Sequence, residues 1–167
     1  MPHVGGVVEH VYVHAPFCAR RCVYCDFAVE VVPRPAEEAW QDVVAAEWRQ
    51  WRDRDVETSA SLETLYVGGG TPSLLPVGAL SAFARAIGIV QGQGSPREWT
   101  AEANPESFTR DVAREWTDAG VNRVSLGVQT FSAAALRWMG RLHDAEDVAE
   151  ALDRARSAGI HNLSVDL

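Results

Sequence analysis

Short β-rich runs alternate with helical patterns along this chain, and this alternation constrains the fold more than any other feature. Strands are expected at residues 11–14, 64–67, 98–102, 123–128 and 162–167, since these runs are rich in apolar and β-branched side chains. Helices are expected from Pro35 to about Arg54, near residues 80–87, over 109–119, from Ser132 to Gly140, and from Asp144 to Gly159. Such alternation predicts a parallel sheet with right-handed crossovers, either a barrel or a doubly wound sheet.

A sequence pattern that occurs twice supports this α/β layout. The segments "AGVNRVSLGV" (119–128) and "AGIHNLSVDL" (158–167) share the order of helix end, glycine, two polar residues and strand. Their glycines, Gly120 and Gly159, are 39 residues apart, about the length of one β/α unit. Because Ala-Gly helix ends are common, the repeated pattern supports the layout without establishing it.

The last expected strand stands at the end of the sequence. A parallel strand is normally covered on both faces, and no helix follows this one. We therefore expect residues 1–167 to be the N-terminal part of a longer domain that ends after its fifth strand. The uncovered edge of that strand predicts that this part alone is unstable.

Composition and charge narrow the class of protein. The 167 residues are 47% apolar and 23% charged, which is typical of a globular domain with a hydrophobic core. The sequence shows neither a signal-peptide pattern nor an apolar run long enough to span a membrane, so a cytoplasmic location is expected. The net charge of −8 disfavours a nucleic-acid partner.

All three cysteines lie within eight residues, directly after the first expected strand. Cys18, Cys22 and Cys25 have the spacing C-x3-C-x2-C. In a reducing compartment, clustered thiols bind metal more often than they form disulfides. Three thiolates can hold three irons of a 4Fe–4S cluster and leave the fourth iron open for a ligand. Two alternatives stay open: a structural zinc site that includes His14, and a reduced thiol cluster without metal.

The other conspicuous residues follow the later strands. "GGGTP", at residues 68–72, is either a tight turn or a loop whose main-chain groups contact a ligand. Glu102, Gln129 and Asp166 lie at or near the ends of the third, fourth and fifth strands. In a parallel barrel these ends meet at one mouth, where active sites are built, although each residue alone is also compatible with a capping role.

The cysteine spacing, with the aromatic Tyr24 before the last cysteine, resembles the signature of radical S-adenosylmethionine (SAM) enzymes. Five segments resemble, in order, the oxygen-independent coproporphyrinogen oxidase family: "YVHAPFCARRCVYCDF", "YVGGGTPSLL", "EANPES", "RVSLGVQTF" and "MGRLH". The resemblance extends over residues 11–167 and implies an α/β fold, the N-terminal part of a partial (β/α) TIM-like barrel of radical SAM type.

The resemblance also implies roles for individual residues. It assigns a 4Fe–4S cluster to Cys18, Cys22 and Cys25, and the SAM bound there to Tyr12, Tyr24, Gly69, Glu102 and Asp166. It assigns a second SAM to Gly70, Thr71, Gln129 and Arg141. No catalytic residue is implied. Arg141 is equally suited to a helix C-terminus, and His143 is expected to have a surface or capping role.

Departures from the family pattern indicate which group of relatives is nearest. Phe27 stands where the porphyrinogen oxidases carry a further cysteine, and the segment before the first strand is short. Both features favour the sister group of heme chaperones, which bind heme and transfer it to acceptor proteins. The alternative is the oxidative decarboxylation of coproporphyrinogen III to protoporphyrinogen IX. The implied partners are heme or porphyrinogen, a low-potential electron donor for the reductive cleavage of SAM, and a heme-acceptor protein.

Overall fold

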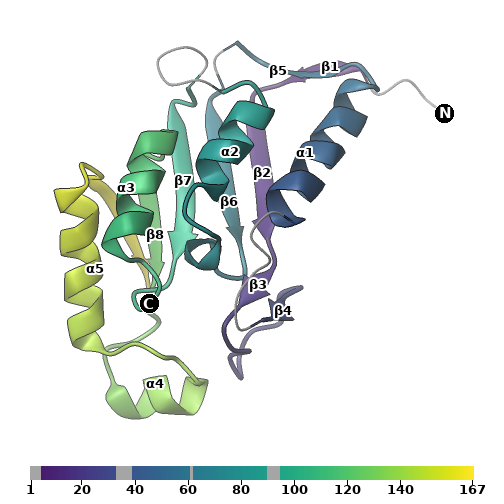
Figure 1. Ribbon diagram of the computed structural model, residues 1–167. Helices are drawn as coiled ribbons and strands as arrows, with labels where there is room; N and C mark the ends of the chain where they lie inside the picture. Colours follow the sequence, from purple (N-terminus) through teal and green to yellow (C-terminus); the bar gives the residue numbers. More distant parts are fainter. Residues whose placement is uncertain (1–4, 33–38, 61, 90–94) are drawn as a thin grey trace.

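The central feature of the fold is a sheet of five parallel strands. A computed structural model describes residues 5–32, 39–60, 62–89 and 95–167. The strands follow one another in chain order: β2 (His10–Ala15), β6 (Thr64–Gly69), β7 (Glu98–Ala103), β8 (Arg123–Gly127) and β9 (Asn162–Asp166) (Figure 1). The crossovers carry α1 (Ala39–Arg52), α2 (Ala79–Ala86), α3 (Arg110–Ala119) and α5 (Ala145–Ser157). The predicted α/β fold is confirmed, while the expected helix start at Pro35 lies outside the described residues.

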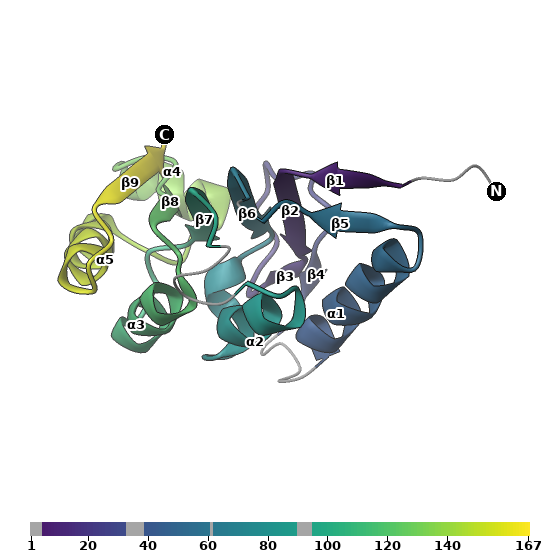
Figure 2. The ribbon, with the colours of Figure 1, turned by 90° about the horizontal axis from the view of Figure 1, so that it is seen from above.

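The four crossover helices cover the same face of the sheet, as in one sector of a (β/α) barrel. Figure 2 shows α1, α2, α3 and α5 on one side of the five strands. Leu65, Trp99 and Val124, which are fully buried, belong to the apolar set of the core. Tyr66 and Thr100 alternate with them and pair across the strands. Side chains alternate between faces along a strand, so the second face of the sheet is polar rather than buried in a second apolar layer.

The helix ends follow the capping signals in the sequence. Thr109 accepts a hydrogen bond from Val112 N at the start of α3, and Gly120 ends that helix with φ 110°. The short helix α4 (Ala133–Met139) begins after Ser132 and ends at Gly140 with φ 78°. Asp144 forms a capping box at the start of α5. Side-chain acceptors satisfy the free N–H groups of a first helical turn, and glycine adopts positive φ without strain.

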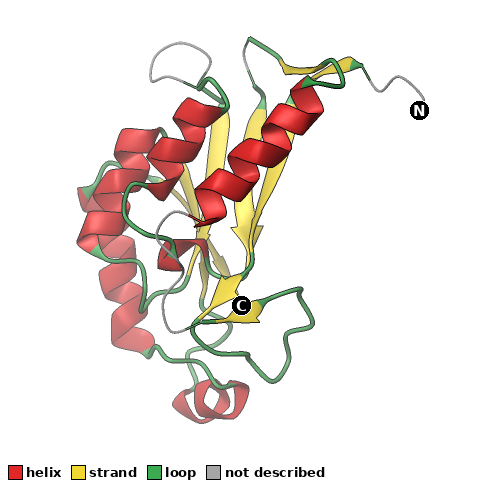
Figure 3. Cartoon of the chain, turned by 45° about the vertical axis from the view of Figure 1, so that its right-hand side comes forward, coloured by secondary structure: helices red, strands yellow, loops and turns green. Residues whose placement is uncertain are grey.

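Several short elements were not predicted. Strand β1 (Gly6–Val8) pairs with β5 (Val56–Thr58), and β3 (Phe17–Cys18) pairs with β4 (Glu30–Val31). A 3₁₀ turn, η1 (Pro72–Leu74), follows β6. Runs of two or three residues carry no readable periodicity. The β3–β4 pair matters for the site, because it joins the two ends of the segment that carries the cysteines (Figure 3).

Strands β2 and β9 are the two edges of the five-stranded sheet. The instability expected of residues 1–167 alone stays a prediction. Within the described ranges, no helix has the length and apolar character needed to cross a membrane.

Candidate cofactor-binding site

A cavity of about 350 Å³ lies at the C-terminal ends of the strands. The carboxyl ends of parallel strands meet at one edge, and the cysteine loop and α4 lie at the same end of the molecule (Figure 1). Eleven predicted site residues line this cavity: Cys18, Cys22, Tyr24, Cys25, Gly69, Gly70, Thr71, Glu102, Gln129, Arg141 and Asp166. Residues from five separate sequence motifs are thus brought together.

Tyr12 is the predicted residue that the structure places elsewhere. It lines a separate groove of about 820 Å³ between β2 and α1. Its ring stacks on Tyr66 with centroids 6.0 Å apart, and its hydroxyl lies 3.0 Å from Nδ1 of His14. Burial, and then the charge of Glu102, raise the pKa of Tyr12. The phenol therefore remains protonated and able to donate.

His14 anchors the cysteine loop. Its Nε2 lies 2.9 Å from the carbonyl oxygen of Ala28, which only accepts, so Nε2 carries the hydrogen. Nδ1 of a neutral imidazole then accepts from the Tyr12 hydroxyl. Both ring nitrogens are engaged, which disfavours the zinc site that includes His14. Within the described residues, no group of three His, Cys, Asp or Glu side chains is placed to hold a single metal ion.

The three thiols are free and partly buried on one loop. The loop is held internally by the hydrogen bond from Cys25 N to Cys22 O (3.2 Å) and externally by that from Val23 N to Met139 O (3.2 Å). Burial raises the pKa of the Cys18 thiol, and so does negative charge on Cys25 and Cys22. Three free thiols at one cavity are a donor set suited to a group with several metal atoms.

The glycine turn packs directly against this loop. Gly69 has φ +117°, and a Cβ there would lie 2.5 Å from the His14 ring. A Cβ on Gly70 would lie 2.6 Å from the carbonyl oxygen of Phe17. A larger residue fits at Gly69 only if the His14 ring moves, and at Gly70 only if the backbone of residues 15–17 shifts. The glycines thus bring the main chain of the turn close to the segment that carries the cysteines. The Gly70 N–H donates to the Ala15 carbonyl oxygen at 2.8 Å.

Glu102 accepts hydrogen bonds from two residues of the neighbouring strand β6. Its Oε1 accepts a hydrogen bond of 2.6 Å from the Tyr66 hydroxyl, and its Oε2 accepts one of 3.0 Å from Gly69 N. Burial and then the hydrogen bond to Glu102 raise the pKa of Tyr66 well above its usual range, so the phenol stays a donor. The carboxylate is oriented before any ligand arrives.

The ends of β8 and β9 are connected in a similar way. The Ser125 hydroxyl donates to Oδ1 of Asp166 at 3.3 Å, and Gln129 N donates to the Asp166 carbonyl oxygen at 2.6 Å. Gln129 has φ 69°, in the left-handed region that non-glycine residues rarely occupy. The strained turn after β8 therefore places Gln129 beside Asp166 at the cavity.

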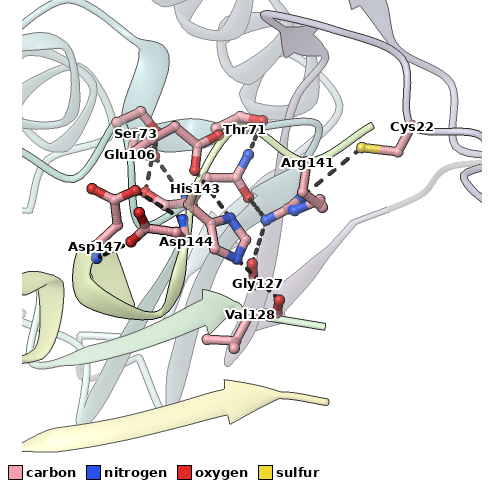
Figure 4. A network of polar contacts seen from close by, with 12 residues as sticks. Cys22, Thr71, Ser73, Glu106, Gly127, Val128, Arg141, His143, Asp144 and Asp147 are labelled. Atoms are coloured by element: carbon pink, nitrogen blue, oxygen red, sulfur yellow. Dashed lines mark hydrogen bonds and ion pairs between the residues drawn. The ribbon is translucent and has the colours of Figure 1, made fainter. Parts of the chain in front are cut away.

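The Arg141 side chain connects three parts of the site, while its main-chain N–H donates to the Leu136 carbonyl oxygen at the end of α4. Its guanidinium donates to Oδ1 of Asn104 at 2.8 Å, to the carbonyl oxygen of Gly127, and to Sγ of Cys22 at 4.0 Å (Figure 4). Asn104 directly follows β7 and lines the same cavity. The "EANPES" motif pointed to Glu102, and no role was predicted for Asn104.

The expectation that His143 has a surface or capping role was wrong. His143 is buried, with Nε2 3.1 Å from the Val128 carbonyl oxygen and Nδ1 3.4 Å from Oε2 of Glu106. Burial acts to raise the pKa of Glu106, but the contact with His143, hydrogen bonding to its own backbone and the charge of Arg141 hold the pKa below its ordinary value. The pair fixes the segment that carries Arg141 against β8 (Figure 4).

Three free thiols, a glycine turn and two carboxylates thus line one cavity at the C-terminal edge of this (β/α)-barrel sector, a donor set that suits a metal cofactor beside an organic ligand. The chain belongs to the radical SAM superfamily, whose family model matches residues 12–167. Membership of this superfamily implies a 4Fe–4S cluster and SAM, and the donor set described above fits them.

Sequence comparison gives more specific likenesses. The chain is 36% identical over 156 residues to the heme chaperone HemW of Lactococcus lactis, covering 93% of this chain and 40% of that protein. It is 36% identical over 168 residues to the mouse mitochondrial radical S-adenosyl methionine domain-containing protein 1, covering 99% of this chain and 37% of that protein. The chain therefore spans about two fifths of the length of these curated relatives.

Solved structures agree on the fold. Coproporphyrinogen III oxidase (HemN) of Escherichia coli superposes with a TM-score of 0.80 at 26% identity, over 98% of this chain and 37% of that one. The radical SAM methyltransferase TsrM of Kitasatospora setae has a TM-score of 0.59 at 16% identity, over 96% of this chain and 30% of that one. The second likeness shows the fold alone.

Proposed function

We propose that this chain is the cofactor-binding part of a radical SAM protein that acts as a heme chaperone. The observation that carries the proposal is the convergence of the three cysteines, the glycine turn and Glu102 on one cavity. The similarity to the heme chaperone HemW of Lactococcus lactis over 93% of the chain supports the choice of heme as the cargo. A cytoplasmic location accords with the reduced thiols that the site requires.

Each residue at the cavity has a place in this proposal. Cys18, Cys22 and Cys25 hold the cluster, which, when bound, supplies an iron position for SAM and one electron. Glu102, fixed by Tyr66, accepts hydrogen bonds from the hydroxyl or amino groups of SAM. The remaining predicted lining residues are assigned as further SAM contacts, including those for the second SAM: Tyr24, Gly69, Gly70, Thr71, Gln129, Arg141 and Asp166.

Phe27 supports the chaperone reading over oxidation of coproporphyrinogen. The side chain is 62% exposed and lines the cavity next to the cysteines. It places a phenyl ring, with no thiol, where the resembled oxidases carry a further cysteine. The likeness to HemN, at a TM-score of 0.80, keeps oxidation as the second candidate.

The test uses the full-length protein, purified and reconstituted without oxygen. Iron and sulfide analysis is expected to give a 4Fe–4S cluster whose electron paramagnetic resonance (EPR) spectrum changes on addition of SAM. Cys22→Ser is expected to lose iron and sulfide. Zinc without sulfide in the wild type would contradict the cluster assignment.

A second measurement separates the two candidate functions. Heme titrated into the reconstituted protein is expected to bind and to pass to an apo-acceptor, while coproporphyrinogen III with SAM and a reductant is expected to remain unchanged. Formation of protoporphyrinogen IX would overturn the chaperone proposal and leave the oxidase. An electron donor of low potential is required in both cases.

A further inference from the structure

Two hydrogen bonds reach the sulfur atoms of the cysteine loop from outside the loop. The Thr71 hydroxyl donates to Sγ of Cys18 at 3.6 Å, and Nη1 of Arg141 donates to Sγ of Cys22 at 4.0 Å. Thr71 precedes η1 after β6, whereas Arg141 follows the C-terminal Gly140 of α4. Hydrogen bonds to cluster sulfurs stabilise the reduced, more negatively charged cluster and so raise its reduction potential.

A single side chain joins these two donors. Nδ2 of Asn104 donates to Oγ1 of Thr71 at 3.3 Å, and Oδ1 of Asn104 accepts from Nη2 of Arg141 at 2.8 Å. The Thr71 hydroxyl accepts from Asn104 and donates its own hydrogen to Cys18. The result is a continuous chain of hydrogen bonds from Cys18 through Thr71, Asn104 and Arg141 to Cys22.

Asn104 is itself held firmly at the end of β7. Its main-chain N–H donates to the Ser73 hydroxyl at 3.2 Å. Its carbonyl oxygen accepts from Ser107 N at 3.1 Å and from Phe108 N at 3.0 Å. Pro105, which follows, restricts the Asn104 backbone to extended conformations. The amide therefore has a fixed base from which to orient both neighbours.

We propose that Asn104 is a positioning residue for the cluster: it holds Thr71 and Arg141 against Cys18 and Cys22 and thereby sets the reduction potential. The inference rests on the proposed cluster site and adds to it a determinant of electron transfer. Asn104 acts through Thr71 and Arg141, and its side chain is the link between these two residues.

The experiment measures the midpoint potential of the reconstituted full-length protein by redox titration followed by EPR. Asn104→Ala removes the hydrogen bonds of the Asn104 amide to both Thr71 and Arg141. At the wild-type midpoint the ratio of reduced to oxidised cluster in this variant is expected to be about tenfold lower, which corresponds to a shift of about 59 mV toward negative potential for one electron. Asn104→Asp is expected to shift the potential in the same direction, since the Thr71 hydroxyl then donates to a carboxylate instead of to Cys18.

Asn122→Ala is the matched control. The Asn122 side-chain amide also makes two hydrogen bonds: its oxygen accepts from Trp99 N at 2.8 Å, and its nitrogen donates to the Arg97 carbonyl oxygen at 3.1 Å. It lies just before β8, at the opposite end of the sheet from the cysteines. This variant is expected to lose stability without a change in potential.

A pair at Thr71 keeps the proposal testable if Asn104→Ala does not assemble a cluster. Thr71→Ser retains the hydroxyl and is expected to keep the wild-type potential, whereas Thr71→Val removes it and is expected to lower the potential. Equal potentials for wild type, Asn104→Asp and Thr71→Val would overturn the inference. A wild-type protein that takes up no cluster would instead contradict the proposed function.

Discussion

The Tyr66 hydroxyl donates a hydrogen bond of 2.6 Å to Oε1 of Glu102, from one strand to the next, at the mouth of the cavity. The two residues are 36 positions apart in the sequence, and the pairing of Tyr66 with Thr100 sets their register. Gly69 N occupies the other carboxylate oxygen. A carboxylate fixed in this way needs no reorganisation to meet a ligand.

Tyr66→Phe is expected to weaken SAM binding to the reconstituted protein about tenfold, because a hydrogen bond to a charged group contributes about 1.5–3 kcal/mol. Isothermal titration calorimetry measures the affinity. Ser81→Ala is the matched control, since the Ser81 hydroxyl also donates to a glutamate, Glu115, at 2.9 Å in the helical layer. Equal SAM affinities of wild type and Tyr66→Phe would contradict a role for this pair.

The sequence predicted the fold through its long elements. The five strands and their covering helices carry enough residues for their periodicity to be read, and Gly120 and Asp144 mark helix ends correctly. The pairs β1–β5 and β3–β4 escaped prediction because strands of two or three residues form only when the tertiary structure brings them together.

Prediction of the site was limited by strand register and by burial. Residues at strand ends could be assigned to one mouth, since that follows from parallel topology alone. The hydrogen-bond partners of Glu102 and Arg141 could not be predicted in this way. Tyr66 and Asn104 come within reach of them only in the observed tertiary structure. His143 was misjudged because the Glu106 partner lies 37 residues earlier in the sequence, in a different loop.

Gly69→Ala is expected to destabilise the protein more than Gly78→Ala. Both glycines have positive φ, +117° and +97°, but a Cβ at Gly69 meets the His14 ring at 2.5 Å, whereas nothing lies within 4 Å at Gly78. Backbone strain costs each variant about 1 kcal/mol, and overpacking adds about 1–3 kcal/mol at Gly69. Urea unfolding measures the difference. Equal losses would show that His14 moves aside freely.

Glu106→Gln tests the buried pair through pH. The pKa of Glu106 lies below its ordinary value of 4.5, so its ionised form stabilises the fold above pH 4.5, and this contribution is lost as pH falls through the lowered value. The variant is expected to be less stable than wild type at pH 7, with the difference shrinking below about pH 4.5. Thermal unfolding of both proteins, measured at a series of pH values from 7 downward, gives the difference in stability.

The control for the pH experiment is Glu57→Gln, at an exposed position on β5. Its stability is expected to run parallel to that of the wild type across the same pH range. A difference between Glu106→Gln and wild type that stays constant with pH would mean that the Glu106 charge makes no contribution, and that the variant affects packing alone.

Arg123 spans three strands on the polar face of the sheet. Nη1 donates to Oγ1 of Thr100 on β7 at 3.1 Å, and Nη2 donates to Oγ of Ser164 on β9 at 3.0 Å. Ser164 in turn donates to Ser125 at 2.8 Å, and Ser125 donates to Asp166. The guanidinium therefore connects the middle of the sheet to the edge strand that ends at the cavity.

Arg123→Met keeps the aliphatic stem but removes both donors, and it is expected to destabilise the protein by about 1–3 kcal/mol. Amide hydrogen exchange in β9 is expected to accelerate more than exchange in β6, because β9 loses a side-chain tie to its neighbour. Arg97→Met is the comparison: Arg97 is 84% exposed and lies 3.6 Å from Glu63, so the loss is expected to stay below about 1 kcal/mol. Similar exchange rates in β9 for the two variants would show that main-chain pairing alone holds the edge strand at the cavity.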